Sequence, residues 1–366
     1  MGKTDIVCKP IILEPLETTL FFRDGKPFQA KGHGTSGLPA PQTLAGALRT
    51  WFLNKMGCDF HKLSRDITER QLSVESAFEE QGPEIAPILD VRFRGPWLSL
   101  EDRPVFTLPA SLRRCKGSAN KKCAPGSMLL PLKGNLPGWK PPQEGMLPLW
   151  CRNIEPLENV EGFLTIEGMR HFLRGSVPQH TDCLSADELY DFDHRIGIGI
   201  DSDSLTTIEG GIYSISLLAL KEQVAFYAEL EGPAQLLNDL ADDEMFQFGG
   251  EKRQVRVRSG PLVDWDSLSN RSGEGRPMLV LITPGLFASS WKPTWLQPIA
   301  AAVHKPLAVS GWDLARGGPK PTRFAAPAGS VYFLDRPLDR NSDSLCESED
   351  AALGWGLCLE GRWNYA

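Results

Sequence analysis

The sequence predicts an α+β fold with two ferredoxin-like (RRM-like) domains in tandem, the first interrupted by a large proline-rich insertion. The length of 366 residues exceeds that of one ordinary domain. The 35 glycines and 29 prolines make up about one residue in six, which favours many turns over a helical bundle. Each half also repeats one expected order: strand, helix, strand, strand, helix, glycine turn and strand. We therefore expect a first domain over 1–262, with the insertion at about 58–190, and a second over 263–366.

The first domain is expected to open with a strand over Ile11–Phe22, which ends in a turn at Arg23–Lys26 because Asp-Gly favours tight turns. A helix is expected over about Thr43–Met56, where a threonine can act as the N-cap and leucines recur on one face. Within the insertion, twelve of the 29 prolines fall between residues 83 and 156. This density predicts short strands and long loops, with a short helix near Ile166–Leu173.

Regular structure is expected to return at His194, where three isoleucines alternate with glycines up to Ile200. The segments Gly211–Leu220 and Val224–Leu230 are then expected to form a hairpin, and Pro233–Leu240 a short helix. A strand follows a double-glycine turn and closes this domain. Its arginines face away from its valines: Arg256 and Arg258 on one side, Val255 and Val257 on the other.

The second domain is expected to repeat this order. Its strands are expected over Met278–Thr283, Leu307–Trp312, Gly329–Leu334 and Leu357–Leu359. Its helices are expected over Thr294–His304 and Ser344–Ala352, and Gly354-Trp355-Gly356 supplies the glycine turn before the last strand. The two halves match in the order of elements and not in the residues themselves.

The charge is unevenly distributed along the chain. The net charge of −7 alone argues against a nucleic-acid-binding protein, but no acidic residue lies between Asp102 and Glu144. That stretch carries eight cations: Arg103, Arg113, Arg114, Lys116, Lys121, Lys122, Lys133 and Lys140. Two smaller basic stretches are Lys252–Arg258 and a Gly/Pro-rich loop with Arg316, Lys320 and Arg323. Such asymmetry indicates an anionic partner at one face, and a solvated basic loop is the plainer alternative.

Several classes of protein are disfavoured. No apolar run reaches the ~18 residues of a membrane helix, and the N-terminus lacks the pattern of a secretion signal. None of the eight cysteines forms a CxxC pair, so we expect reduced thiols in a cytoplasmic protein. Neither a nucleophile with its base nor the ligand spacing of a zinc site is visible. We therefore expect no metal, no cofactor and no enzymatic activity.

His33 is the most tempting single residue for acid–base chemistry. It lies between Gly32 and Gly34, so the flanking glycines can let its imidazole reach a scissile phosphate. The plainer interpretation, which we favour, is a loop histidine that hydrogen-bonds backbone or contacts RNA without chemistry.

The double-glycine turn at Gly249–Gly250 is the most informative motif. Because it has no side chains, its backbone N–H groups can meet an approaching phosphate. Lys252 and Arg253 add positive charge at the same place, and the following strand extends the charge through Arg256 and Arg258. The alternative is an ordinary turn with solvated cations.

Six short motifs occur in order along the chain: Leu13–Leu16 with Phe21–Phe28, Thr43–Arg49, Arg195–Ile198, Gly249–Glu251, Pro327–Phe333, and Gly354–Gly356 with Gly361–Trp363. Together they make the chain similar to one known family, the third subunit of the type III-B CRISPR effector, or Cmr complex, in the RAMP superfamily. The resemblance covers nearly the whole chain, although the proline-rich insertion matches nothing in it.

The resemblance implies two ferredoxin-like domains, each with a glycine-rich loop, and a thumb-like β-hairpin that begins near Arg195. It also implies a subunit that is not a nuclease, holds the 5′ repeat-derived tag of the CRISPR RNA, and contacts the large polymerase-like subunit and the first backbone subunit. The RNA-binding residues expected from the motifs and the basic stretch are Arg23, Lys26, His33, Arg49, Arg195, Gly249, Gly250, Lys252, Arg253, Arg256 and Arg258.

Two rival functions stay open at this point. One is a CRISPR RNA processing endoribonuclease on the same fold, with His33 as its acid or base. The other is a scaffold that bridges proteins and barely touches RNA. Neither the preferred tag sequence nor the role of residues 103–143 follows from the residues.

Overall fold

The computed structural model describes residues 5–23, 34–117, 124–134, 136–201, 203–204, 206–313, 316–339 and 342–366. The chain divides into two compact units, each made of three segments. Unit 1 comprises residues 1–96, 190–260 and 308–323, and unit 2 comprises 97–189, 261–307 and 324–366. The α+β class is confirmed, because the sheets are mostly antiparallel and the helices few. No helix in the described part of the chain is both long and apolar enough to cross a membrane.

The units differ from the expected domains in two respects. Residues 308–323, expected in the second domain, belong to unit 1. Residues 58–96 of the expected insertion belong to unit 1, whereas residues 97–189 belong to unit 2 together with the C-terminal strands. The ferredoxin-like domain boundaries, 1–262 and 263–366, stay a prediction.

Unit 1 is built on a sheet in the strand order β16-β17-β1-β15-β3. Its central strand β1 pairs antiparallel with both neighbours, and residues 11–13 at its middle are completely buried. β3 continues past residue 96 into unit 2. The strands span Ile6–Pro15 (β1), Arg92–Leu100 (β3), Val224–Pro233 (β15), Met245–Gln247 (β16) and Gln254–Ser259 (β17).

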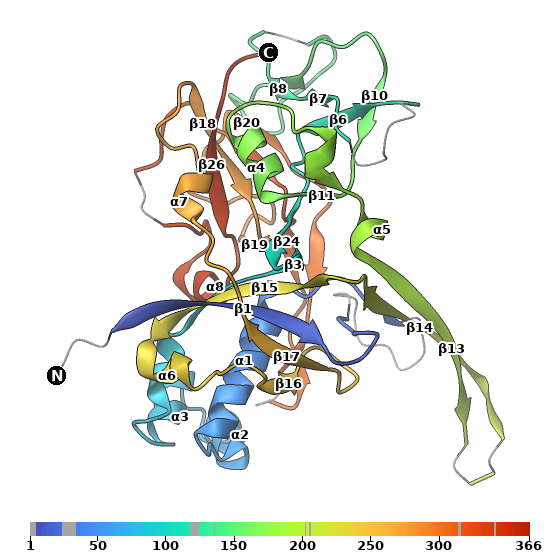
Figure 1. The fold of residues 1–366 in the computed structure, drawn as a ribbon, viewed down its shortest axis with the longest axis vertical. Helices are drawn as coiled ribbons and strands as arrows, with labels where there is room; N and C mark the ends of the chain where they lie inside the picture. Colours follow the sequence, from blue (N-terminus) through green and yellow to red (C-terminus); the bar gives the residue numbers. More distant parts are fainter. Residues whose placement is uncertain are drawn as a thin grey trace. The chain divides into compact units, whose positions relative to one another are not determined.

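Helix α1, Pro41–Lys55, lies beside this sheet and contacts β16 (Figure 1). Its Leu44, Leu48 and Phe52 are fully buried, as a period of three to four apolar residues requires. The helix was expected at Thr43–Met56, and the structure starts it two residues earlier because Pro41 suits the first turn, where no N–H partner is needed. The other helices of unit 1 are α2 (Phe60–Thr68), α3 (Val74–Glu79), the 3₁₀ helix Ala86–Asp90 and α6 (Ala234–Asn238).

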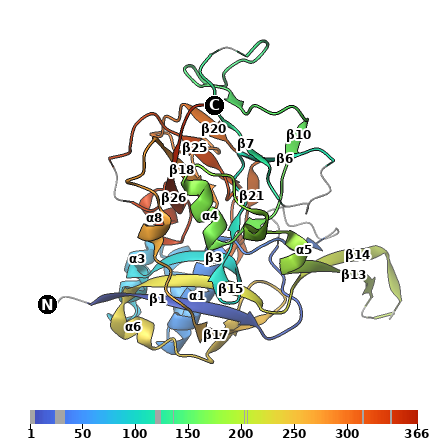
Figure 2. The same cartoon turned by 45° about the horizontal axis from the view of Figure 1, so that its top comes forward.

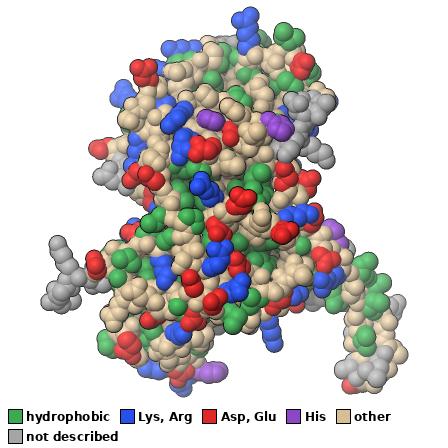
Figure 3. Space-filling model, in the orientation of Figure 1, with side chains coloured by type: hydrophobic (Ala, Val, Ile, Leu, Met, Phe, Trp, Pro, Cys, Tyr) green, Lys and Arg blue, Asp and Glu red, His purple; other side chains and the backbone are tan. Residues whose placement is uncertain are grey.

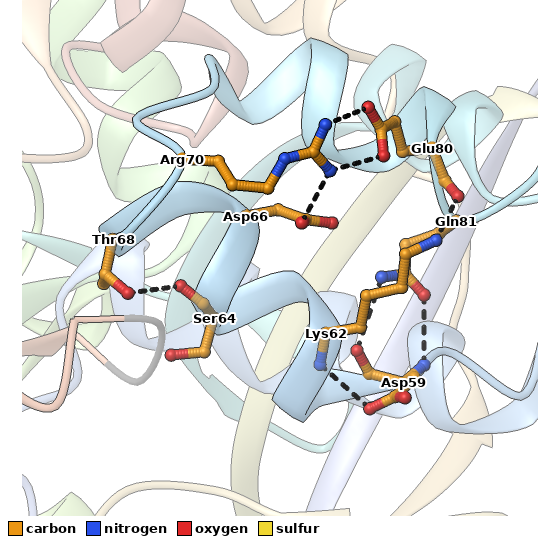
Figure 4. Close-up of polar contacts among 8 residues, drawn as sticks. All are labelled: Asp59, Lys62, Ser64, Asp66, Thr68, Arg70, Glu80 and Gln81. Atoms are coloured by element: carbon orange, nitrogen blue, oxygen red, sulfur yellow. Dashed lines mark hydrogen bonds and ion pairs between the residues drawn. The ribbon is translucent and has the colours of Figure 1, made fainter.

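Polar side chains fix α2 and α3 to each other (Figure 4). Asp59 caps α2 by accepting hydrogen bonds from the backbone N–H groups of His61 and Lys62 at 2.9 and 3.0 Å. The guanidinium of Arg70, which follows α2, binds Asp66 at 2.9 Å and Glu80 beyond α3 at 2.7 Å. These contacts hold a local pair of short helices that has few apolar residues of its own.

A long hairpin of β13 (Tyr190–Ile200) and β14 (Thr207–Leu220) extends away from the sheet of unit 1 in both ribbon views (Figures 1 and 2). A short parallel strand, β2 (Gly34–Thr35), joins β14 at its base. The expected hairpin between 211–220 and 224–230 is wrong, because β14 pairs with β13 and β15 pairs with β1. β15 is buried along nearly its whole length, so it suits an interior position of the sheet. β14 has exposed residues such as Ile212 and Tyr213 in its outer part and does not suit that position.

Unit 2 holds a sheet in the strand order β20-β25-β18-β26, made of Ala300–Ala302, Val331–Phe333, Arg276–Leu281 and Cys358–Trp363. Trp363 is buried beside it and donates its indole N–H to the carbonyl of Pro277 at 2.9 Å. The expected helix at 294–304 is wrong. Pro293 and Pro298 remove backbone donors there, and residues 300–302 instead pair with β25.

The remaining elements of unit 2 are short. The helix predicted at Ile166–Leu173 is confirmed as α4, and the others are α5 (Ala186–Leu189), α7 (Trp265–Leu268), α8 (Ser348–Ala352) and the 3₁₀ helix His180–Asp182. The strands are β4 (Arg103–Pro104), β5 (Phe106–Thr107), β6 (Leu112–Cys115), β7 (Ser127–Met128), β8 (Leu130–Pro131), β9 (Leu149–Trp150), β10 (Leu157–Asn159), β11 (Phe163–Leu164), β12 (Cys183–Leu184) and β19 (Gly285–Leu286). β21 (Leu307–Val309) and β24 (Arg323–Ala326) lie at the segment ends, and β22 (Trp312–Asp313) and β23 (Gly318–Pro319) belong to unit 1.

Candidate nucleic-acid interface

Four segments of unit 1 meet at one place, which we call the Phe21 corner: residues 20–23, 36–37, 216–218 and 249–250. Backbone hydrogen bonds join Leu20 to Leu218 at 2.7 and 2.8 Å, Ser36 to Ser216 at 3.0 Å and Gly37 to Phe22 at 2.8 Å. Phe22 anchors the corner to the core through edge contacts with Phe226 and Phe248, at ring separations of 5.7 and 5.0 Å. The glycine turn, the base of the long hairpin and the segment before Arg23 are therefore held together.

The double-glycine turn is packed tightly on this corner. Gly250 donates its N–H to the carbonyl of Phe21 at 2.8 Å. Gly249 has a φ of +89°, and a Cβ at this position would lie 2.5 Å from the same carbonyl oxygen. The expectation that both amides stay open to a phosphate is thus corrected for Gly250, whose N–H already has an acceptor. Glycine is required here by the approach of the turn to its own chain.

The two cations of the turn differ in exposure. Lys252 is exposed, and its backbone φ of +55° is a strained value for a residue other than glycine. Arg253 is partly buried, and its Nε is enclosed with no hydrogen-bond partner among the residues that the structure describes. Such an enclosed donor is costly unless an acceptor reaches it. Arg253 is therefore a candidate to receive an anionic oxygen.

β17, the strand after the turn, carries less net positive charge than its two arginines alone would give it. Glu14 on β1 accepts hydrogen bonds from Arg256 at 2.8 Å and from Arg258 at 2.7 Å. Partial burial alone would raise the pKa of Glu14, but the hydrogen bonds from the two arginines outweigh it and lower the pKa. One carboxylate thus neutralises part of the charge that was expected to continue along this strand. Val255 and Val257 are buried on the opposite face, as predicted.

The long hairpin presents an apolar face. Ile196, Ile198, Ile200 and Ile212 are 79%, 54%, 62% and 71% exposed, and Figure 3 shows a chain of apolar side chains along this arm. Ile196 and Ile198 are therefore uncovered within this chain. Arg195, on the same strand, forms an ion pair with Asp193 at 2.7 Å. Soluble proteins leave contiguous apolar surface mainly where a partner covers it, so this arm is a candidate interface.

The other face of the hairpin is not bare, although glycines line it in the sequence. Gly197 and Tyr213 are paired across the two strands, and the ring of Tyr213 occupies the space that a Cβ at Gly197 would need. The ring is about half exposed. An aromatic face on an extended arm is the kind of group on which an unpaired base can stack.

The remaining predicted residues are placed as follows. Arg49 lies on α1, with its guanidinium 5.5 Å from the ring of Phe93. Burial lowers the pKa of Arg49, and its Nε has no hydrogen-bond partner within the described ranges. Arg23 is exposed and forms a backbone bridge with Ser36 in the Phe21 corner. Lys26 and His33 lie outside the residues that the structure describes.

Three of the eight cations in the basic stretch of residues 103–143 are used inside unit 2. Arg113 donates to the carbonyls of Ala110 and Leu112 at 2.6 and 2.7 Å. Arg114 pairs with Glu158 at 2.6 Å, and Lys133 lies 4.3 Å from the ring centre of Tyr365. Arg103, Lys116 and Lys140 are exposed, and residues 118–123, with two lysines, lie outside the described residues.

Nothing in the described residues assembles a metal site: no group of three histidine, cysteine or acidic side chains is placed to hold an ion. One close pair was not predicted from the sequence: His171 Nδ1 and Asp182 Oδ2, at 2.9 Å. Asp182 also accepts the backbone N–H of Gln179 at 3.0 Å, so it orders the turn before β12. Tyr213 and the exposed Trp312 were not predicted either, because their aromatic character was the only signal in the sequence.

The comparison with protein families decides the identity. Residues 11–363 match the family described as "CRISPR-associated protein (Cas_Cmr3)". The chain belongs to this family. The similarity to the third Cmr subunit is thereby confirmed, and the chain is a RAMP-like subunit of a type III CRISPR effector. No curated protein matches the sequence of this Cas_Cmr3 member.

This Cas_Cmr3 member is similar to chains of solved CRISPR effector structures. A chain of the type III-B Cmr-beta complex bound to cognate target RNA and AMPPnP, state 1, is similar with a TM-score of 0.51 and 17% identity, over 89% of this chain and 86% of that chain. A chain of the Csm3-Csm4 subcomplex of the type III-A CRISPR-Cas interference complex has a TM-score of 0.44 and 12% identity, over 97% of this chain and 99% of that one. The first of these likenesses supports a shared fold.

Proposed function

We propose that this chain is a non-catalytic RNA-binding subunit of a type III-B CRISPR interference complex. In this role it holds the 5′ repeat-derived tag of the CRISPR RNA and bridges the large polymerase-like subunit to the backbone subunit. The observation that carries the proposal is the arm formed by β13 and β14, which exposes four isoleucines on one face and Tyr213 on the other. The isoleucine face of this arm suits an apolar protein partner, and the ring of Tyr213 suits a ligand with bases that can stack on it.

The RNA contact is centred on the Phe21 corner, where the arm joins the glycine turn. Lys252 is exposed there, and Arg253 carries an enclosed Nε that lacks a protein acceptor in the described residues. Phosphate oxygens are charged acceptors, so they suit both groups. Single-stranded RNA brings phosphates and unpaired bases together, which matches cations beside an aromatic arm.

Gly249 and Gly250 set the path of the turn and do not themselves contact the RNA. Because Gly249 and Gly250 lie against Phe21, the turn keeps a close, fixed path that positions Lys252 and Arg253. We thus assign the phosphate contacts to these two side chains, with Arg49 as a further, partly buried cation of unit 1. Arg256 and Arg258 share Glu14 and contribute less net charge.

The charge contact is tested by the double variant Lys252→Ala, Arg253→Ala. Purified chain is titrated with tag RNA at several salt concentrations. Each lost phosphate contact lowers the slope of log affinity against log salt by roughly 0.7, so two lost contacts flatten it by about 1.4. The matched control is Lys140→Ala, Lys305→Ala, which removes the same charge from exposed positions of unit 2 and leaves the slope unchanged. An unchanged slope in the Lys252, Arg253 variant contradicts this RNA contact.

The same experiment separates the two rival functions. Wild-type affinity of the double variant for isolated tag RNA, with failure only when partner subunits are added, identifies a protein-bridging scaffold. Site-specific cleavage of a repeat RNA by the purified wild-type chain identifies a processing endoribonuclease. Crosslinking of guide RNA in the assembled complex maps which residues of the corner and the arm it touches.

A further inference from the structure

A second hairpin in unit 1 takes no part in the interface described above. It lies in the segment 308–323 and consists of β22 and β23, and we call it the Trp312 hairpin. Its base is fixed at the first turn of α1, where Gln42 Nε2 donates to the carbonyl of Ser310 at 2.6 Å. Lys320 also donates its N–H to the carbonyl of Gly311 at 2.8 Å. The hairpin is thus held at its base by the long helix of the unit.

The surface of this hairpin combines one aromatic ring with cations. Trp312 is 50% exposed and lies opposite Pro319 in the antiparallel register, so both side chains lie on one face. Arg316 is two-thirds exposed, and Asp313 fixes its position by accepting its backbone N–H at 3.1 Å and its guanidinium at 3.2 Å. Lys320 and Arg323 are exposed on the returning strand and beyond it.

The charge favours an anionic ligand. Residues 312–323 contain one acidic residue, Asp313, and three cationic residues, and the next acidic residue in the sequence is Asp335. The apolar surface, by contrast, is small: among the described residues of 312–323 it consists of the indole of Trp312 and the rings of Pro319 and Pro321. A stable protein interface needs a larger apolar centre than this, whereas an unpaired base needs a single aromatic face.

We propose that the Trp312 hairpin is a second contact site for single-stranded RNA, at which Trp312 stacks on an unpaired base and Arg316, Lys320 and Arg323 face the adjoining phosphates. The site rests on the proposed function only in taking RNA as the ligand of this chain. It is built from residues other than those of the Phe21 corner, so each site can be altered without the other.

The stacking is tested with the purified full chain and an unstructured RNA of about ten nucleotides, within the usual length of a single-strand site. Trp312→Ala is expected to weaken binding by about 5-fold to 150-fold, the range that corresponds to losing one stacked base. The salt slope is expected to stay at its wild-type value, because no charge is removed. Trp312→Phe is expected to restore most of the affinity. The control is Trp150→Ala, a tryptophan of similar exposure (43%) in unit 2, which is expected to bind as wild type.

The charge contribution is tested separately with Lys320→Gln. This change keeps a long polar side chain and is expected to lower the salt slope by roughly 0.7, the value for one phosphate contact on a single strand. Ultraviolet crosslinking of the bound RNA, followed by mass spectrometry, is expected to find an adduct on the peptide that contains Trp312.

The outcomes distinguish the two proposals. Wild-type RNA affinity of Trp312→Ala, in a chain that itself binds RNA, overturns the second site and leaves the corner intact. No RNA binding by the wild-type chain overturns the proposed function and the second site together. Normal RNA binding of Trp312→Ala with loss of assembly with partner subunits assigns the hairpin to a protein contact and overturns the RNA assignment.

Discussion

The ring of Tyr213 lies on the backbone of Gly197 across the strands of the β13–β14 arm, in the space where any other residue would place its Cβ. The alternation of glycine and isoleucine on this strand therefore has two different uses. Gly197 makes room for the aromatic ring, and the isoleucines form the opposite, exposed face. A single strand pair thus carries an apolar side for a protein partner and an aromatic side for a base.

The first prediction concerns the isoleucine face. Ile196→Asp together with Ile198→Asp is expected to leave the thermal unfolding midpoint of the isolated chain nearly unchanged, because both side chains are exposed. The same variant is expected to fail to enter the guide-bound complex, since two buried charges without partners are costly. Size-exclusion chromatography of the reconstituted complex measures this. Normal assembly of the variant would show that nothing covers the face, and Ile196→Val with Ile198→Val is the control that keeps it apolar.

The second prediction concerns the packing of the glycine turn. Gly249→Ala places a methyl group 2.5 Å from the carbonyl oxygen of Phe21 at a φ of +89°. The free energy of unfolding is expected to fall by about 1–3 kcal/mol, as for a side chain forced into a strained backbone position. Denaturant titration measures it.

A matched control exists on α1. Gly46→Ala adds its methyl group at an exposed helical position with nothing within 4 Å, so stability is expected to rise by roughly 0.5–1 kcal/mol. Equal unfolding free energies for Gly249→Ala and the wild-type chain would mean that the turn does not lie against Phe21.

The third prediction concerns pH and Glu14. Hydrogen bonds from Arg256 and Arg258 more than offset the effect of partial burial, so the pKa of Glu14 in the folded chain lies below its ordinary value of 4.5. A depressed carboxyl pKa stabilises the folded chain at pH values above the unfolded pKa, and this contribution is lost as the pH falls through the folded pKa. Glu14→Gln is therefore expected to be less stable than the wild-type chain at pH 7 and to approach it below about pH 4.

Denaturant titrations of both chains across this pH range check that expectation. Glu144→Gln, at an exposed position of unit 2, serves as the control and is expected to follow the wild-type curve. A stability difference between Glu14→Gln and the wild-type chain that stays constant down to acid pH speaks against the ion pairs with the two arginines.

The fourth prediction concerns His33. In the absence of a catalytic role, His33→Ala is expected to leave target cleavage by the assembled complex intact, or to lower it only in proportion to lost RNA binding. General acid–base catalysis contributes about 100-fold or more to a rate. A fall of that size with RNA binding unchanged would contradict the non-catalytic role, and His33→Gln, which keeps hydrogen-bonding capacity, distinguishes a lost contact from a lost proton donor.

Local patterns predicted the local elements well. α4 was found at its full extent because Thr165 caps it with its hydroxyl, at 3.2 Å from the N–H of Gly168, and its apolar residues repeat at helical spacing. The strand after the glycine turn was found because its valines and arginines alternate strictly. The prediction of a helix at 294–304 was wrong because a short apolar run near prolines is as typical of a strand as of a helix, and the run forms β20.

The pairings between distant segments were not predictable in the same way. β15 is the strand that is buried on both faces, and it pairs with β1, which lies about 200 residues earlier in the chain. β14 therefore pairs with β13 and not with β15. Likewise, the sequence shows that Gly249 and Gly250 permit a close approach but not that Phe21 makes it. The order of the elements was predicted from local sequence patterns, whereas only the structure shows what each glycine faces.

The division of each unit into three separated segments has a consequence for how the chain can be cut and how it is synthesised. A fragment that ends at residue 262 lacks the 308–323 segment that docks on Gln42, and a fragment that begins at 263 lacks residues 97–189 of unit 2. Neither unit is available as a piece of continuous chain. On the ribosome, all strands of the unit 1 sheet have emerged by residue 259, but unit 1 as a whole stays incomplete until residue 323, when much of unit 2 is already present.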